Sequence, residues 1–179
     1  MSMEESEANP LKSFDELLAE LNKEAANHKR DRDNFQNQAK VWADKRDKCN
    51  ALARSKASQA AVFKEHRDEY NREVKVAKEQ RDKWNNTAID CHDRGFGNSS
   101  EAKNQANSYH QQIVQNSANG QAAHEKMSQL YAEADELHQQ SDDAHKKFLI
   151  CNKAGDIEHQ NYIVVIKKIQ KLRDGLPDD

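Results

Sequence analysis

Residues 28–50 read HKRDRDNFQNQAKVWADKRDKCN, and the spacing of their nonpolar residues decides the fold. Phe35, Trp42 and Cys49 lie seven residues apart, and Ala39 follows Phe35 by four residues. Alternating steps of four and three residues place side chains on the face of one helix that packs against another helix. The stretch therefore predicts a coiled-coil helix.

The pattern continues in both directions from this stretch. Of twelve positions counted by sevens from Phe14 to Cys91, ten are apolar or aromatic. A second row follows four residues behind, from Leu18 to Ala88. A strict seven-residue repeat favours left-handed supercoiling around at least one other helix, so residues 14–91 are predicted to form one helix.

The repeat breaks at residues 93–100 and then resumes. Gly95 and Gly97 can end a helix, and Asn98, with Glu101 three residues later, can cap the next one. Two further rows then start at Ala102 and Ala106 and predict a second helix over residues 101–173. The expected fold class is all-α: a long antiparallel coiled-coil hairpin over residues 13–175, with dimerisation left open.

Three details complete this expected architecture. An acidic flexible tail is expected at residues 1–12, and a short acidic tail at residues 176–179. Gly120 and Gly155 lie inside the second helix, where each glycine costs about 1 kcal/mol relative to alanine. We therefore expect a kink or local fraying in that helix, most of all near residues 116–121.

The composition argues against a compact enzyme. Only 35% of the 179 residues are hydrophobic and 33% are charged, whereas a compact enzyme usually has nearly half its residues apolar. The longest apolar run has five residues and the start of the chain is acidic, which predicts a cytoplasmic protein without a membrane segment. The three cysteines are far apart, so we expect reduced thiols.

Acidic and histidine motifs do not add a catalytic or metal site to the prediction. Asp31 and Asp33 flank Arg32 as in the nucleophile loop of haloacid-dehalogenase-type phosphatases, but no strand precedes them. Five histidines lie on multiples of seven in the second helix, a pattern typical of a solvated flank: His110, His124, His138, His145 and His159. We predict no catalytic, cofactor-binding or metal-ligating residue, and no cofactor.

An Arg-Asp-x-x-Asn/Gln motif recurs four times in the first helix at multiples of seven. Its arginines occupy the second seam row: Arg32, Arg46, Arg67 and Arg81. An arginine in a seam needs partners, because an unpaired buried charge costs several kcal/mol. These arginines are interpreted as fixing the register of the hairpin, with the binding of phosphate or of an acidic partner as the alternative.

The antiparallel register suggests partners for three of these arginines. Folding about Phe96 places residues whose numbers sum to roughly 193 side by side. This predicts three approaches across the hairpin: Arg67 to Glu125, Arg46 to Asp142 and Asp143, and Arg32 to Glu158.

The open end of the hairpin is more apolar than one seam requires. Residues 148–151 and 162–166 are apolar around more of the helix than a single partner covers. The candidate interaction end consists of Phe14, Leu17, Phe148, Tyr162, Ile163, Val164 and Ile166. It could bind a second copy of the chain or another protein, or pack against residues 11–22 of the same chain.

The first helix also has a basic stretch. Residues 23–83 hold 17 Lys and Arg against 11 Asp and Glu, while the chain as a whole has a formal charge of -3. A basic stretch with bulky aromatic residues can bind RNA, although charges of both signs usually mean a solvated helix face.

Two ordered blocks carry a resemblance to a known family. They are the Lys-Arg-Asp-x-x-Asn repeats within residues 45–85 and the stretch from Leu130 to His138 that continues to Phe148. Together they resemble a family of uncharacterised archaeal coiled-coil proteins, some of which are labelled phosphoserine phosphatase. The resemblance implies an antiparallel coiled coil in an archaeal cytoplasm, with no established activity.

Two functional hypotheses follow. The first is a non-enzymatic scaffold or adaptor that binds itself or another protein through the apolar open end. The alternative is an RNA- or ribosome-associated factor that uses the basic stretch, an idea supported by a distant similarity to a eukaryotic polysome-associated, messenger-RNA-binding coiled-coil family.

Overall fold

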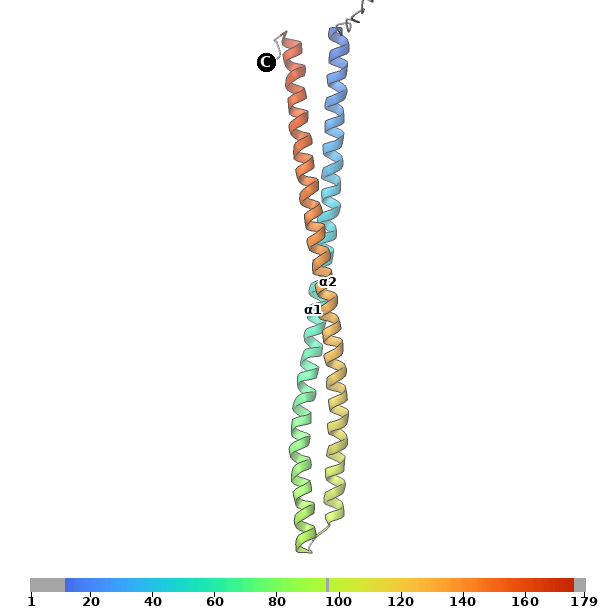
Figure 1. Cartoon of the computed structure of the whole chain (residues 1–179), viewed down its shortest axis with the longest axis vertical. Helices are drawn as coiled ribbons and strands as arrows, with labels where there is room; N and C mark the ends of the chain where they lie inside the picture. Colours follow the sequence, from blue (N-terminus) through green and yellow to red (C-terminus); the bar gives the residue numbers. More distant parts are fainter. Residues whose placement is uncertain (1–11, 96, 176–179) are drawn as a thin grey trace, which may run out of the picture. The chain divides into compact units, whose positions relative to one another are not determined.

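The protein consists of two long helices in the computed structural model, which describes residues 12–95 and 97–175. Helix α1 spans Phe14–Arg94 and helix α2 spans Ser99–Asp174. The two helices run antiparallel and pack against each other (Figure 1), and no strand occurs in the described residues. The predicted all-α helical hairpin is confirmed. Apart from Lys12, the two predicted acidic tails lie outside the described residues.

Local signals set the helix ends. The backbone N–H of Ser13 donates to the Glu16 carboxylate at 2.9 Å, and the Glu16 N–H donates to the Ser13 hydroxyl at 3.3 Å, which forms a capping box. The hydrogen bonds from Ser13 lower the pKa of Glu16. Helix α1 continues past the predicted end at residue 91 because Gly95, with φ of 64°, is the first residue to leave the helical conformation.

The bend between the helices depends on Gly97 and Asn98. Gly97 has a φ of 79°, a left-handed conformation that favours glycine. The Asn98 side-chain oxygen accepts a hydrogen bond from the Glu101 N–H at 3.1 Å. Helix α2 therefore begins at Ser99, two residues before the predicted start at residue 101.

The helices form two compact units. Unit 1 combines residues up to Asp47 with residues from Ser141 onward, and unit 2 spans Lys48–Gln140. In unit 1, Ala25, Val165 and Ile169 form a buried cluster against which Leu18, Leu21 and Tyr162 pack. The corresponding cluster in unit 2 contains Ala60, Met127 and Leu130, with Phe63 packed against it.

Burial follows the predicted seam rows. Every buried residue in the described part of the chain lies in one of the four rows. Eleven of the eighteen buried hydrophobic residues are alanines, and Ala53 and Ala60 have no exposed surface. The larger side chains of the α1 rows, such as Phe35, Trp42 and Trp84, are half-buried. The seam is thus narrow, and small side chains form most of its centre.

The register differs from the predicted sum of 193. Gly155 lies next to Phe35 in unit 1, and Gly120 lies next to Tyr70 in unit 2, so both pairs have numbers that sum to 190. In an antiparallel coiled coil, each residue of one seam row packs against a residue of the complementary row on the other helix. The sum of the two residue numbers can therefore take only values that differ by seven. The sum of 190 satisfies this condition for both rows.

The expected local fraying near residues 116–121 was wrong. Helix α2 is continuous through this segment, and Gly120 is buried rather than exposed. A Cβ atom at Gly120 would lie 3.5 Å from the Tyr70 Cβ, and one at Gly155 would lie 3.6 Å from the Phe35 Cβ. Both glycines therefore lie where an aromatic residue of α1 crosses the seam, and packing keeps the helix intact there.

Candidate interaction surfaces

The four seam arginines are half-buried, and each pairs with the aspartate that follows it. The Arg32 Nη2 lies 2.6 Å from Asp33, and the Arg67 Nη2 lies 2.6 Å from Asp68. Arg46 and Arg81 pair with Asp47 and Asp82 at 2.8 and 2.7 Å. The motif thus supplies its own counter-charge, so each guanidinium reaches the seam edge as part of an ion pair.

The predicted carboxylate partners of these arginines across the hairpin were wrong. Within the described residues, no seam arginine forms an ion pair with α2. Arg67 instead contacts the Met127 sulfur at 3.8 Å, and the Arg46 guanidinium lies 5.6 Å from the centre of the Phe148 ring. A carboxylate one residue away is available before the helices pair, which explains why it is preferred.

Other residues provide the polar contacts across the seam, a histidine–carboxylate hydrogen bond in unit 1 and a lysine–carboxylate ion pair in unit 2. The His28 Nδ1 lies 2.5 Å from the Glu158 carboxylate in unit 1, and the Lys56 Nζ lies 2.6 Å from Glu133 in unit 2. The hydrogen bond from Lys56 is the main cause that lowers the pKa of Glu133. His28 and Lys56 are the two polar members of the row counted from Phe14. Their polar side chains in an otherwise apolar seam row were the sequence signal that each contacts a carboxylate of the other helix.

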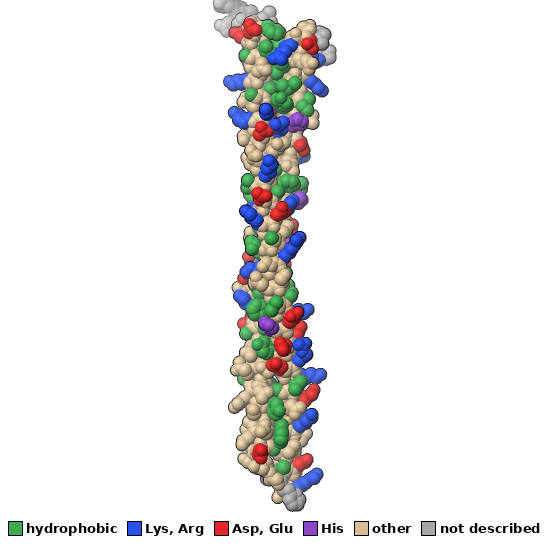
Figure 2. All heavy atoms as spheres, turned by 180° about the vertical axis from the view of Figure 1, so that it is seen from behind, with side chains coloured by type: hydrophobic (Ala, Val, Ile, Leu, Met, Phe, Trp, Pro, Cys, Tyr) green, Lys and Arg blue, Asp and Glu red, His purple; other side chains and the backbone are tan. Residues whose placement is uncertain are grey.

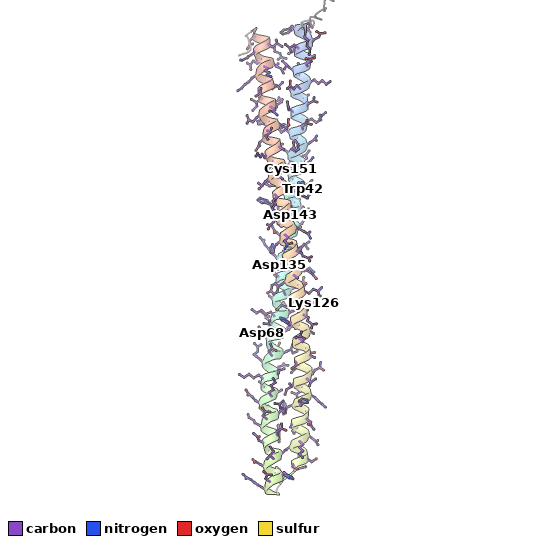
Figure 3. The ribbon with its side chains drawn as sticks, in the orientation of Figure 1. Trp42, Asp68, Lys126, Asp135, Asp143 and Cys151 are labelled. Atoms are coloured by element: carbon purple, nitrogen blue, oxygen red, sulfur yellow. The ribbon has the colours of Figure 1, made fainter. Side chains whose placement is uncertain are left out.

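Trp42 lies between two lysines in unit 1. The Lys147 Nζ is 4.4 Å from the centre of its ring, and the Lys45 Nζ is 5.4 Å from it. Figure 3 shows Trp42 on α1 between the levels of Cys151 and Asp143 on α2. Both distances lie within the range of a cation–π interaction.

The structure divides the seven predicted residues of the interaction end. Phe148, Tyr162 and Ile163 are half-buried, and Phe148 also stacks on His145 with ring centres 6.0 Å apart. Four residues remain exposed: Phe14, Leu17, Val164 and Ile166. Packing within the chain covers part of the set and leaves the rest accessible.

Sequence reasoning missed part of this surface. Ile150, Ile157 and Val164 follow one another at seven-residue intervals and are 67%, 51% and 51% exposed. Leu149 is 52% exposed beside them. Val164 was predicted, and Leu149 and Ile150 lie in the apolar stretch 148–151, but Ile157 was missed; its seven-residue spacing from Ile150 and Val164, outside the two seam rows, was the signal that could have identified it. Figure 2 shows hydrophobic side chains gathered near the end of unit 1 where α1 begins and α2 ends.

The remaining candidate features are open and polar. All five histidines of α2 are exposed, and no group of three or more potential metal ligands occurs within residues 12–95 and 97–175. Asp31 pairs with Arg30 at 3.2 Å and Asp33 with Arg32, both within α1. A groove of about 630 Å³ lies beside the bend in unit 2, lined by Asn85, Ala88, Ile89, His92, Asp93 and Lys103.

Neither helix, over the residues the structure describes, is long and apolar enough to span a membrane. The cysteines of the chain are free, with Cys49 and Cys151 buried in the seam. Their sulfurs face amide oxygens, at 4.0 Å for Gln140 beside Cys49 and 3.8 Å for Gln38 beside Cys151. These thiols are thus part of the packing.

Comparison with known proteins places the chain in a family. The model of a family of unknown function, DUF7121, matches residues 16–94 and 93–176. The chain belongs to this family, whose matched regions cover both helices. No curated protein and no solved structure matches the chain.

Proposed function

We propose that the protein is a non-enzymatic coiled-coil scaffold or adaptor that binds another protein through unit 1. The observation that carries this proposal is the concentration of exposed apolar side chains on α2 in that unit. Five large ones occur within eighteen residues: Leu149, Ile150, Ile157, Val164 and Ile166. Three of these residues, Ile150, Ile157 and Val164, lie on one line of the helix because they are seven residues apart, and exposed apolar residues on one face are typical of protein–protein interaction sites.

The grooves on the described helices support the same proposal. They are shallow depressions along a two-helix surface, whereas small-molecule and active sites are usually concave and enclosed. A two-helix surface offers long faces to other helices instead. We further propose an archaeal, cytoplasmic setting, which rests on the sequence resemblance and on the reduced thiols expected there.

The RNA or ribosome hypothesis has less support. It depends on the basic residues between 23 and 83, yet the four seam arginines in that stretch are each engaged by the following aspartate. Phosphate binding would have to compete with these ion pairs. The basic excess available to a nucleic acid is therefore smaller than the count of residues suggests.

Affinity capture from the native cell tests the proposal. We would compare the tagged wild-type chain with Val164→Ser/Ile166→Ser in unit 1 and with Val114→Ser/Tyr131→Ser in unit 2. The expected result is a defined protein partner that is lost with the unit 1 variant and retained with the unit 2 variant. Capture that is equal for both variants, or that disappears after ribonuclease treatment, would contradict the proposal.

A further inference from the structure

A line of exposed apolar residues runs along α2 in unit 1. We call it the α2 stripe and define it as Ile150, Ile157 and Val164. Half-buried Ala154 and exposed Asn161 follow the first two members by four residues, so the line repeats in steps of four and three. These steps are those of a helix-packing seam, but α1 does not cover this line, because the stripe lies outside the rows buried between the helices.

Lysines border the α2 stripe. Between residues 146 and 173, α2 holds seven Lys and Arg against two acidic residues, Asp156 and Glu158. Glu158 is engaged by His28 across the seam. Lys153, Lys167 and Lys168 take part in none of the ion pairs that unit 1 forms among residues 12–47 and 141–175.

No ion pair among the described residues of unit 1 joins a carboxylate of α1 to Lys153, Lys167 or Lys168. Four carboxylates of α1 pair with a Lys or Arg of residues 12–46: Glu20 with Lys12, Asp31 with Arg30, Asp33 with Arg32 and Asp47 with Arg46. Glu24 lies 3.7 Å from the His28 ring. Unit 1 thus presents an apolar line along which basic side chains outnumber acidic ones, and Lys153, Lys167 and Lys168 form no ion pair with another described residue of the unit.

These features define the chemistry of a partner. The members of the α2 stripe are two helical turns apart, a rise of about 10.5 Å, which matches the seven-residue repeat of a helix lying alongside. The bordering lysines favour carboxylates on that helix. A nucleic acid would use the charges but would leave three branched aliphatic side chains without contacts.

We propose that the α2 stripe binds an acidic amphipathic helix of a partner protein. Apolar residues of that helix, spaced by three and four, pack on Ile150, Ile157 and Val164, while its carboxylates lie against Lys153, Lys167 and Lys168. This inference rests on the proposed adaptor function and names the partner chemistry and the face of unit 1 that recognises it.

A labelled synthetic peptide tests the proposal with the full-length protein. The probe is a helical peptide with leucines spaced by three and four and glutamates on both sides of them, and its binding is followed by fluorescence anisotropy. Ile157→Gln is expected to raise the Kd by about tenfold or more, because one buried aliphatic contact is lost. Val114→Gln is the matched control: Val114 is 57% exposed on α2 in unit 2, and its replacement leaves the Kd unchanged.

Charge variants test the second half of the proposal. Lys153→Glu/Lys168→Glu is expected to weaken binding of the glutamate peptide and to allow binding of a peptide in which lysines replace the glutamates. Circular dichroism checks that each variant keeps the helical content of the wild type. All substituted side chains are exposed, so folding is retained.

Several outcomes would overturn the proposal. They are equal effects of Ile157→Gln and Val114→Gln, equal binding of a scrambled peptide of the same composition, or insensitivity to the lysine reversals. Sedimentation gives another: a dimer that is lost with Ile157→Gln, together with no peptide binding, would assign the stripe to a second copy. If the peptide does not bind but cellular capture still depends on Val164 and Ile166, the acidic-helix partner is rejected and the adaptor function is retained.

Discussion

Unit 1 and unit 2 share one seam design but differ in their outer surfaces. Both place small residues at the centre and aromatic residues along the edges, and both contain one glycine opposite an aromatic side chain. The line of Ile150, Ile157 and Val164 can be followed back along α2 in steps of seven residues. In unit 2 these steps reach Glu136, Gln129, Ala122 and Gln115, none of which is a large apolar residue. The seam therefore sets the fold in both units, whereas the outer line differs between them and is the basis for the binding proposed for unit 1.

The largest expected effect breaks the core of one unit. Leu130 is 2% exposed within the unit 2 cluster, so Leu130→Ala is expected to lower the free energy of unfolding by about 2–5 kcal/mol. Trp84 lies in unit 2 and Trp42 in unit 1, so urea unfolding followed by fluorescence of single-tryptophan forms reports which unit is weakened. Leu52→Ala, at a side chain that is 54% exposed, is the control and should change stability by less than about 0.5 kcal/mol.

The next effect concerns the bend, a feature that only unit 2 contains. Gly97→Ala forces a side chain into a left-handed conformation, and the new Cβ would lie 3.2 Å from the Cys91 sulfur. We expect a loss of about 1–2 kcal/mol in the free energy of unfolding, measured with urea. An Ala variant as stable as the wild type would show that the bend relaxes without cost.

A third prediction compares the two helical glycines directly. Gly120→Ala in unit 2 and Gly155→Ala in unit 1 each add a Cβ at an ordinary contact distance, 3.5 Å or more from the nearest side-chain atom. Each substitution is expected to raise the free energy of unfolding by up to about 1 kcal/mol, because alanine favours the helix. A destabilised variant in only one unit would reveal that its seam is too close to admit a methyl group.

The smallest effect depends on pH and concerns the Lys56–Glu133 pair of unit 2. The pKa of Glu133 is lowered below its ordinary value of 4.5, so the folded state binds the proton less readily than the unfolded state. The pair therefore stabilises the fold above pH 4.5 and loses this contribution as the pH falls through the lowered pKa. Thermal unfolding of the wild type and Glu133→Gln is expected to differ slightly at neutral pH and to converge in acid.

Much of the fold could be predicted from the sequence, because a seven-residue repeat has few structural solutions. Ala53, Ala60 and Leu130 lie in predicted rows and are buried as expected. The register was three residues off, since the length of the bend alone does not fix which layers meet. The requirement that each seam row packs against the complementary row of the other helix would have selected the observed register.

The candidate site was less predictable because side-chain choices are local. Arg46 has carboxylates available on both helices, and the pattern alone does not show that it takes Asp47 rather than Asp142 or Asp143. Ile157 stands between charged residues, Asp156 and Glu158, so no apolar run draws attention to it. Its exposure became evident only when the structure showed which line of α2 the seam leaves uncovered.

The alanine-rich centre has a thermodynamic consequence. The heat capacity change of unfolding scales with the apolar area that becomes hydrated, and alanine contributes little of it. The stability curve of this protein is therefore expected to be flatter than that of a globular domain of equal length. Its free energy of unfolding would then vary little between cold and warm conditions.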